Sequence, residues 1–191
     1  LFRNLAHACY TFAKTLNKRV RSLHHYRQNT RKSCISSFLP LFAYLKVKST
    51  TMSWDSYIDN LLGHCKSQDG SIMVDKACII DLEGGAPLTT DGHPNALKLQ
   101  GDEGVKIAAC FRSADFNHFM AQGIYAEGVR YTFLRVDDDR VVLAKEKDNG
   151  SLTLQKSKTA IVIAHTIEGG QQGVTNKGVN VIAEYLESLA M

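Results

Sequence analysis

Cys110 and His165 are the two side chains of this sequence that could together perform covalent chemistry. A histidine base beside a cysteine thiol generates the thiolate nucleophile of a hydrolase. No local pattern supports this pairing, because Cys110 ends an apolar helical segment, where a lone cysteine is usually part of the core. A thiol hydrolase therefore remains a rival hypothesis, and we expect no catalytic residues in this chain.

Two short motifs could bind ions or phosphate, but their spacing does not support it. Asp137, Asp138 and Asp139 lie between two expected strands, where adjacent carboxylates are usually solvated and do not enclose Ca²⁺. The segment 169–173 (GGQQG), with Lys177 after it, lacks the spacing of a phosphate-binding loop. We therefore expect neither a metal site nor a cofactor, and the glycines should form a turn before the last helix.

Two aromatic residues, Trp54 and Tyr57, point to binding and not to catalysis. At positions i and i+3 they share one side of an expected helix. Burial of both rings in the core is the alternative that amphipathicity alone favours. Trp54, however, lies in the first turn, which is a poor place for a core anchor. Beside Tyr185 of the last helix, both rings would face water in a shallow groove suited to polyproline II segments.

Such a groove requires a first and a last helix that lie side by side, and the sequence contains the pattern of both. Apolar residues at helical spacing follow Ser53, a favourable N-cap residue, and continue to Cys65. The same spacing over 176–189 predicts the last helix, and a further helix is expected from Asp102 to Phe111.

The segments between these helices predict an antiparallel sheet. Apolar and β-branched runs indicate strands at 77–81, 129–136, 141–147, 151–155 and 159–166. Asp148-Asn149-Gly150 between two of them is a strong hairpin signal. Most connections are too short for a parallel crossover, so the fold class is α+β, with terminal helices covering a meander.

Residues 1–51 and 52–191 differ sharply in charge. The first segment contains ten Lys and Arg residues and no Asp or Glu, whereas the second contains 13 basic and 19 acidic residues. The basic segment has three interpretations: untranslated messenger RNA sequence that has been read as protein upstream of a start at Met52, a mitochondrial-type targeting peptide, or a nucleic-acid-binding arm. We favour the first interpretation, so we expect a 1–51 extension without packed structure, a single domain over 52–191, and no nucleic-acid partner.

The five cysteines are odd in number and have no metal-finger spacing. Buried, reduced thiols in a cytosolic protein are therefore the expected state. No run reaches the roughly 18 consecutive apolar residues that a membrane-spanning helix requires.

Four stretches resemble the profilin family, in its animal type: SWDSYIDNLL (53–62), ACIIDLEGGAP (77–87), TAIVIAH (159–165) and NKGVNVIAEYLESLAM (176–191). The resemblance covers essentially all of 52–191 and none of 1–51. It implies a central antiparallel sheet with the N- and C-terminal helices packed together on one face and smaller helices on the other.

The resemblance implies a non-enzymatic protein that binds monomeric actin and regulates its polymerisation and nucleotide exchange. It implies further partners, namely proline-rich proteins such as formins, and phosphoinositide lipids bound peripherally. It also implies a cytoplasmic, cytoskeletal location. The alternative is a small α+β sensor or trafficking adaptor domain without actin binding, which would not bind poly-L-proline.

The resemblance places a polyproline site at one end of the two terminal helices. Tyr185 falls where many animal profilins have His, and Met191 falls where a terminal aromatic residue often stands. Leu88 follows Pro87 where the family often has Trp, so one stacking surface is missing and weaker polyproline binding is expected. The implied residues are Trp54, Tyr57, Leu88, Tyr185, Leu186 and Met191.

The resemblance places actin binding on the third-helix region, the middle strands and the turn before the last helix. Asn176 and Lys177 match the family through the NKG motif, whereas the strand positions match more loosely. Lys145 and Lys147 have a second interpretation, as solvated cations that protect a sheet edge from aggregation. The same cations are candidates for phosphoinositides. The implied actin-binding residues are Phe119, Met120, Ala121, Arg135, Lys145, Lys147, Gly173, Asn176 and Lys177.

Overall fold

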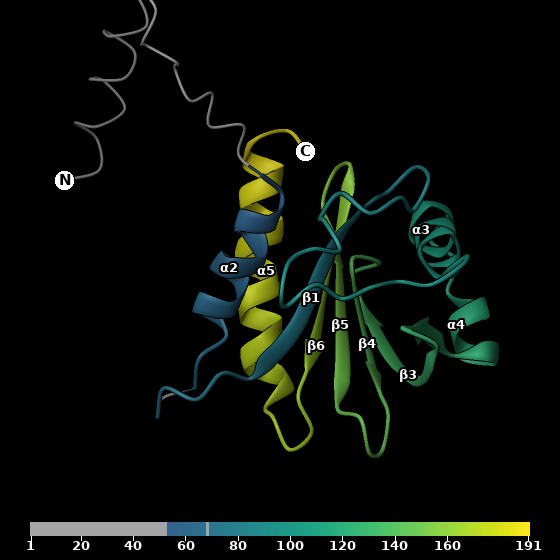
Figure 1. The fold of residues 1–191 in the computed structure, drawn as a ribbon. Coiled ribbons are helices and arrows are strands. Elements are labelled where there is room, and N and C mark those ends of the chain that lie inside the picture. Colours follow the sequence, from purple (N-terminus) through teal and green to yellow (C-terminus); the bar gives the residue numbers. More distant parts are fainter. Residues whose placement is uncertain (1–52, 68) are drawn as a thin grey trace, which may run out of the picture. The chain divides into compact units, whose positions relative to one another are not determined.

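The computed structural model describes residues 53–67 and 69–191, and the prediction for residues 1–51 lies outside this part of the chain. The described residues form an α+β fold with one six-stranded sheet and four helices (Figure 1). In chain order these are α2 (Asp55–His64), β1 (Val74–Asp81), α3 (Glu103–Ser113), α4 (Asn117–Gln122), β2 (Ile124–Ala126), β3 (Val129–Asp137), β4 (Val141–Lys145), β5 (Ser151–Lys156), β6 (Ala160–Thr166) and α5 (Gln172–Ser188).

The sheet has the strand order β1-β6-β5-β4-β3-β2, and each neighbouring pair is antiparallel, as predicted. The expected hairpin joins β4 to β5, with Lys145 paired to Ser151 at its closed end. Gly150 in this turn has φ +79°, and a Cβ there would lie 2.0 Å from the carbonyl oxygen of Thr166. Only glycine fits, because the conformation is left-handed and the neighbouring strand is too close.

Helices α2 and α5 lie side by side on one face of the sheet (Figure 1). Their inward apolar residues pack with β1 and β6 in a core that includes Ile58, Leu61, Val162 and Ile182. The two helices approach closely at Gly178, where a Cβ would lie 2.2 Å from the sulfur of Cys65. A glycine in mid-helix costs helix propensity, and here it allows this helix pair to pack.

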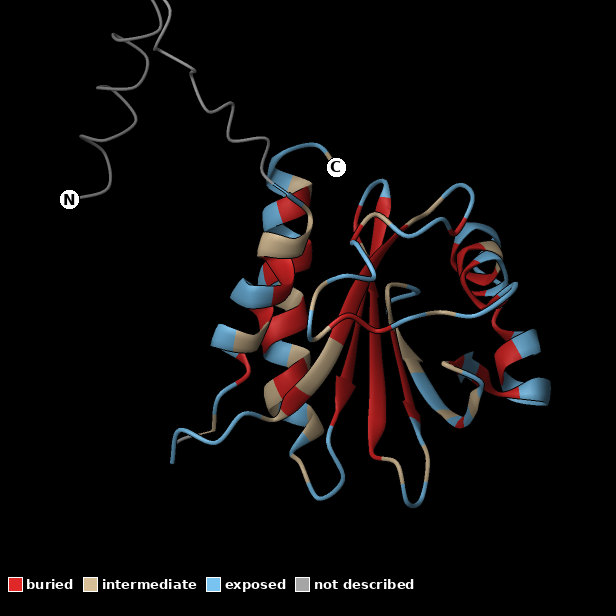
Figure 2. Ribbon diagram, viewed as in Figure 1, coloured by how far each residue is buried: buried red, intermediate tan, exposed pale blue. Residues whose placement is uncertain are grey.

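Helices α3 and α4 cover the opposite face of the sheet. Phe111 and Phe119 anchor this second core against β4, β5 and β6, with ring centroids 6.4 Å apart. Strands β5 and β6 are buried along nearly their whole length, because both of their faces are covered (Figure 2). The predicted arrangement, with terminal helices on one face and smaller helices on the other, is confirmed.

The elements differ from the prediction mainly at their ends. Strand β1 begins at Val74, three residues before the predicted start, and α5 begins at Gln172 instead of Asn176. Helix α4 and the three-residue strand β2 were not predicted. Asp102 occupies the N-cap position of α3 without a capping side-chain bond, and its carboxylate instead pairs with Lys106 at 3.0 Å.

Candidate functional site

Three aromatic rings meet where α2 lies beside α5, as the sequence predicts. The Trp54 and Tyr57 centroids are 5.6 Å apart, and those of Tyr57 and Tyr185 are 6.1 Å apart. Tyr185 is 45% exposed and Trp54 is half-buried, so both present ring surface to solvent. The three rings, which we name the aromatic cluster, contact one another across two helices.

The prediction that both α2 rings face water is wrong for Tyr57, because this residue is only 4% exposed. At i+3 from Trp54 it turns toward α5 and lies between the other two rings. Burial, and secondarily the nearby Tyr185 hydroxyl, raises the pKa of the Tyr57 phenol. Tyr57 thus supports the cluster from below, and Trp54 and Tyr185 carry the exposed faces.

The other predicted polyproline residues divide into core and rim. Leu186 is fully buried, so its implied contact with a ligand is wrong: it faces the α2–α5 core one position after the exposed Tyr185. Leu88 and Met191 are partly buried against the same core. Met191 is held by its main chain, because its N–H donates to Leu186 and its carbonyl accepts from Lys158.

A carboxylate fixes Leu88 beside the aromatic cluster. Asp55, in the first turn of α2, accepts hydrogen bonds from the backbone N–H and the hydroxyl of Thr90, both at 2.7 Å. These two bonds, the backbone bond first, lower the pKa of the Asp55 carboxyl. The loop after β1 is thereby tied to α2, and it carries Leu88 two residues before Thr90.

A second exposed surface lies on the sheet beyond α5, and it is basic. Helix α5 packs chiefly on β5 and β6. Strand β3 and the Lys145 end of β4 remain exposed on that face, whereas Leu143 of β4 is buried. Lys145 is paired across the strands with Thr132 and is exposed, as are Arg135, Lys147 and Lys177. Lys145 and Lys147 line a hollow of about 380 Å³ together with Gln172 and the turn 167–170.

The remaining predicted actin-binding residues are not equivalent. Phe119 is 1% exposed and belongs to the α3–α4 core, so its implied role at a surface is wrong. Its neighbours Met120, 60% exposed, and Ala121 remain accessible. Asn176 is half-buried because its side-chain oxygen accepts from the Thr153 hydroxyl at 2.7 Å, whereas Gly173 is exposed.

The sequence interpretation missed Arg130, an exposed cation on β3 next to this surface. Its Nε donates to the carbonyl of Gln122 at 2.7 Å, which directs the side chain toward the end of α4. Strand periodicity gives a signal for it, because residues 130 and 132 lie on the same face of an expected strand.

His165 is not available as a base for Cys110. Both ring nitrogens are engaged, Nδ1 with the Asp75 carboxylate and Nε2 with the Asn149 carbonyl. Burial raises the pKa of the Cys110 thiol, which disfavours a thiolate nucleophile. The hypothesised thiol–base pair is therefore contradicted. Cys65, Cys78 and Cys110, the cysteines of the described residues, are buried and unpaired.

Over residues 53–67 and 69–191, no three His, Cys, Asp or Glu side chains are arranged to hold a metal ion. Within the same ranges, no helix is both long and apolar enough to cross a membrane.

Comparison with known proteins agrees with this geometry. The profilin family model matches residues 52–191. A profilin of Clypeaster japonicus is 66% identical over 140 residues, which cover 73% of this chain and 100% of the relative. Acanthamoeba castellanii profilin II has a TM-score of 0.60 at 28% identity, covering 73% of this chain and 100% of that one.

Mouse profilin IIa, solved in complex with a double repeat from the FH1 domain of mDia1, shares the fold. It has a TM-score of 0.53 at 18% identity, over 72% of this chain and 99% of that one. Given the family match over 52–191 and the identity to the Clypeaster protein along its full length, the chain belongs to the profilin family of actin-binding regulators.

Proposed function

We propose that this profilin binds monomeric actin through the exposed basic face of β3 and β4 together with the start of α5. It binds proline-rich segments, such as those of formins, through the aromatic cluster, and it acts in the cytoplasm and at the cytoskeleton without catalysing a reaction. The observation that carries the proposal is the convergence of Trp54, Tyr57 and Tyr185 from opposite ends of the domain.

The aromatic cluster suits a polyproline II ligand for two physical reasons. The ligand is already extended, so it loses little conformational entropy when it docks. Proline rings are flat and apolar, and they pack against the exposed faces of Trp54 and Tyr185. The sensor or adaptor alternative offers no role for two accessible rings supported by a third, and the family assignment removes it.

The basic face suits an acidic protein surface. Residues 52–191 carry a formal net charge of −6, so general attraction to an anion is excluded and the local group of cations must act. Met120 is 60% exposed and offers an apolar contact on α4, which packs against β3 from the other face of the sheet. Binding to this face would also modulate nucleotide exchange on actin, and the same cations would contact phosphoinositide headgroups in competition with actin.

Removing one exposed ring tests the polyproline site. Tyr185→Ala should lower affinity for a proline-rich peptide by about 1 kcal/mol, roughly fivefold, because a stacking surface is lost. Val181→Ala is the matched control, because Val181 is 42% exposed one turn earlier on α5. Peptide titration by fluorescence measures both, and equal affinities for wild type and Tyr185→Ala would refute the assigned site.

A further inference from the structure

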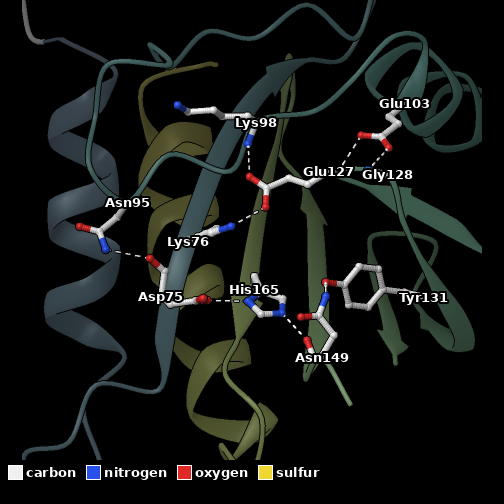
Figure 3. A network of polar contacts seen from close by, with 10 residues as sticks. All are labelled: Asp75, Lys76, Asn95, Lys98, Glu103, Glu127, Gly128, Tyr131, Asn149 and His165. Atoms are coloured by element: carbon white, nitrogen blue, oxygen red, sulfur yellow. Dashed lines mark hydrogen bonds and ion pairs between the residues drawn. The ribbon is translucent and has the colours of Figure 1, made fainter. Parts of the chain in front are cut away.

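A chain of hydrogen bonds crosses the sheet at the closed end of the β4–β5 hairpin (Figure 3). The His165 imidazole of β6 lies between the Asp75 carboxylate and the Asn149 carbonyl, with both contacts at 2.5 Å. The Asn149 side chain then donates to the Tyr131 hydroxyl at 2.8 Å. These four residues, which we name the His165 relay, connect β1, β6, the hairpin turn and β3.

The contacts require one proton more than a neutral imidazole carries. The Asn149 carbonyl can only accept, so Nε2 must be protonated. An ionised Asp75 carboxylate can also only accept, so Nδ1 must donate as well, which makes His165 an imidazolium. If the ring loses a proton, the stronger acceptor, Asp75, retains its bond, and an Nε2 lone pair then faces the Asn149 carbonyl.

The charges around the ring favour its protonated form. Burial opposes the charge, but the bonds to Asp75 and Asn149 together raise the pKa of His165. Lys76 on β1 opposes the charge, although its ammonium is bound to Glu127 at 2.5 Å.

Other groups also bear on the relay. Tyr131 of β3 lies 5.9 Å from the imidazole, and the carboxylates of Asp75, Glu127 and Glu146 act on its phenol. After burial, the largest cause, these negative charges raise the pKa of Tyr131 to about 12, so it stays a neutral donor and acceptor.

The relay fixes the turn that carries part of the proposed actin surface. The backbone N–H of Glu146 donates to Gly150 at 3.0 Å and closes the turn, and Lys147 lies between them. On the other side of this turn lies the hollow lined by Lys145 and Lys147. The position of Asn149 relative to β6 therefore sets the position of Lys147, whereas Lys145 is held by its pairing in the sheet.

We propose that His165 is a positioning residue for actin binding: its imidazolium anchors the 146–150 turn, and loss of its proton releases the turn and weakens the complex. The inference rests on the proposed actin-binding function and adds a dependence on pH. The folded protein binds the His165 proton more tightly than the unfolded chain does. The anchor is therefore complete below about pH 6.5, the unfolded pKa, and is lost as pH rises through the higher pKa of the folded state.

The test compares actin affinity across pH in the full chain, using wild type, His165→Gln and His93→Gln. Glutamine can still donate to Asn149 but does not titrate. His93 lies 3.2 Å from Asp59 of α2 and takes no part in the relay, so it controls for loss of an imidazole. From pH 6.5 to about pH 8.5, wild type and His93→Gln should lose about fivefold more affinity than His165→Gln.

Two further readouts keep the test decisive if His165→Gln folds poorly. In wild type, NMR should show the His165 ring titrating together with the amide exchange of Asn149 and Gly150. In Asp75→Asn, the ring should titrate at lower pH, because the carboxylate is gone. The inference would be overturned, with actin binding left intact, if actin affinity had the same pH profile in all three proteins. It would also be overturned if the amide exchange of Asn149 and Gly150 did not change as His165 titrates. A wild type that binds no actin at any pH would overturn the proposed function itself.

Discussion

Leu88 is the residue at which this profilin departs most from an aromatic binding surface. It packs against the rim of the α2–α5 core and is held there by the Asp55–Thr90 bonds. An aliphatic side chain contributes apolar area, but it lacks the flat face and quadrupole that favour stacking against a ring.

An indole at this position should strengthen polyproline binding. Leu88→Trp is expected to raise affinity for a proline-rich peptide by about 1 kcal/mol, because it adds a stacking partner on a loop that is already fixed. Leu134→Trp, at a 51% exposed position on β3, adds the same ring away from the aromatic cluster. Isothermal titration with the peptide measures the affinity of both variants. An unchanged affinity for Leu88→Trp would place the ligand elsewhere.

Among the elements, the pair α2–α5 matters most, because it brings the aromatic residues together. The close approach of the two helices depends on Gly178, which leaves room for the sulfur of Cys65. Burial raises the pKa of this thiol to about 11, so Cys65 stays neutral and acts as packing. Helix separation here sets the distance from Tyr57 to Tyr185.

A methyl group at this contact should push the helices apart. Gly178→Ala is expected to lower the free energy of unfolding by roughly 1–3 kcal/mol through overpacking. Gly63→Ala in α2 is the matched control, because within the described residues no neighbour lies within 4 Å of its added Cβ. That change should stabilise by about 0.5–1 kcal/mol through helix propensity. Urea denaturation measures both, and a Gly178→Ala protein as stable as wild type would contradict the packing argument.

Strong periodicity made the terminal helices and the long strands predictable. Helix α4 has six residues and β2 has three, which is too few for a pattern to emerge. Burial of Tyr57 and Leu186 depends on the angle at which α2 meets α5, and sequence spacing alone does not give that angle. The Asp75–His165 contact joins residues 90 positions apart, and no local signal connects them.

At the scale of the molecule, helix α5 lies between two surfaces with different chemistry. The aromatic cluster lies at the end of the α2–α5 pair near Met191, and the basic face lies on β3 and β4 beyond α5. Since the two proposed sites use opposite ends of α5, we expect that a proline-rich ligand and actin can bind one molecule together. Their energetics also differ, because apolar stacking is insensitive to salt and contact between charges is screened.

Reversing two charges should therefore affect one surface and spare the other. Lys145→Glu with Lys177→Glu is expected to slow actin association about tenfold at low salt, and to weaken binding to phosphoinositide vesicles, because electrostatic steering is lost. Lys98→Glu with Lys158→Glu makes the same change of net charge at exposed sites outside this face. Stopped-flow association with labelled actin compares the two. If both pairs slow it equally, net charge and not the β3–β4 face controls the encounter.

The anchoring of Met191 bears on how this protein should be tagged. Its main chain is hydrogen-bonded on both sides, to Leu186 and to Lys158, so a fluorescent protein fused after it would emerge next to Trp54 and Tyr185. A tag at the carboxyl end is therefore expected to obstruct the proposed polyproline site.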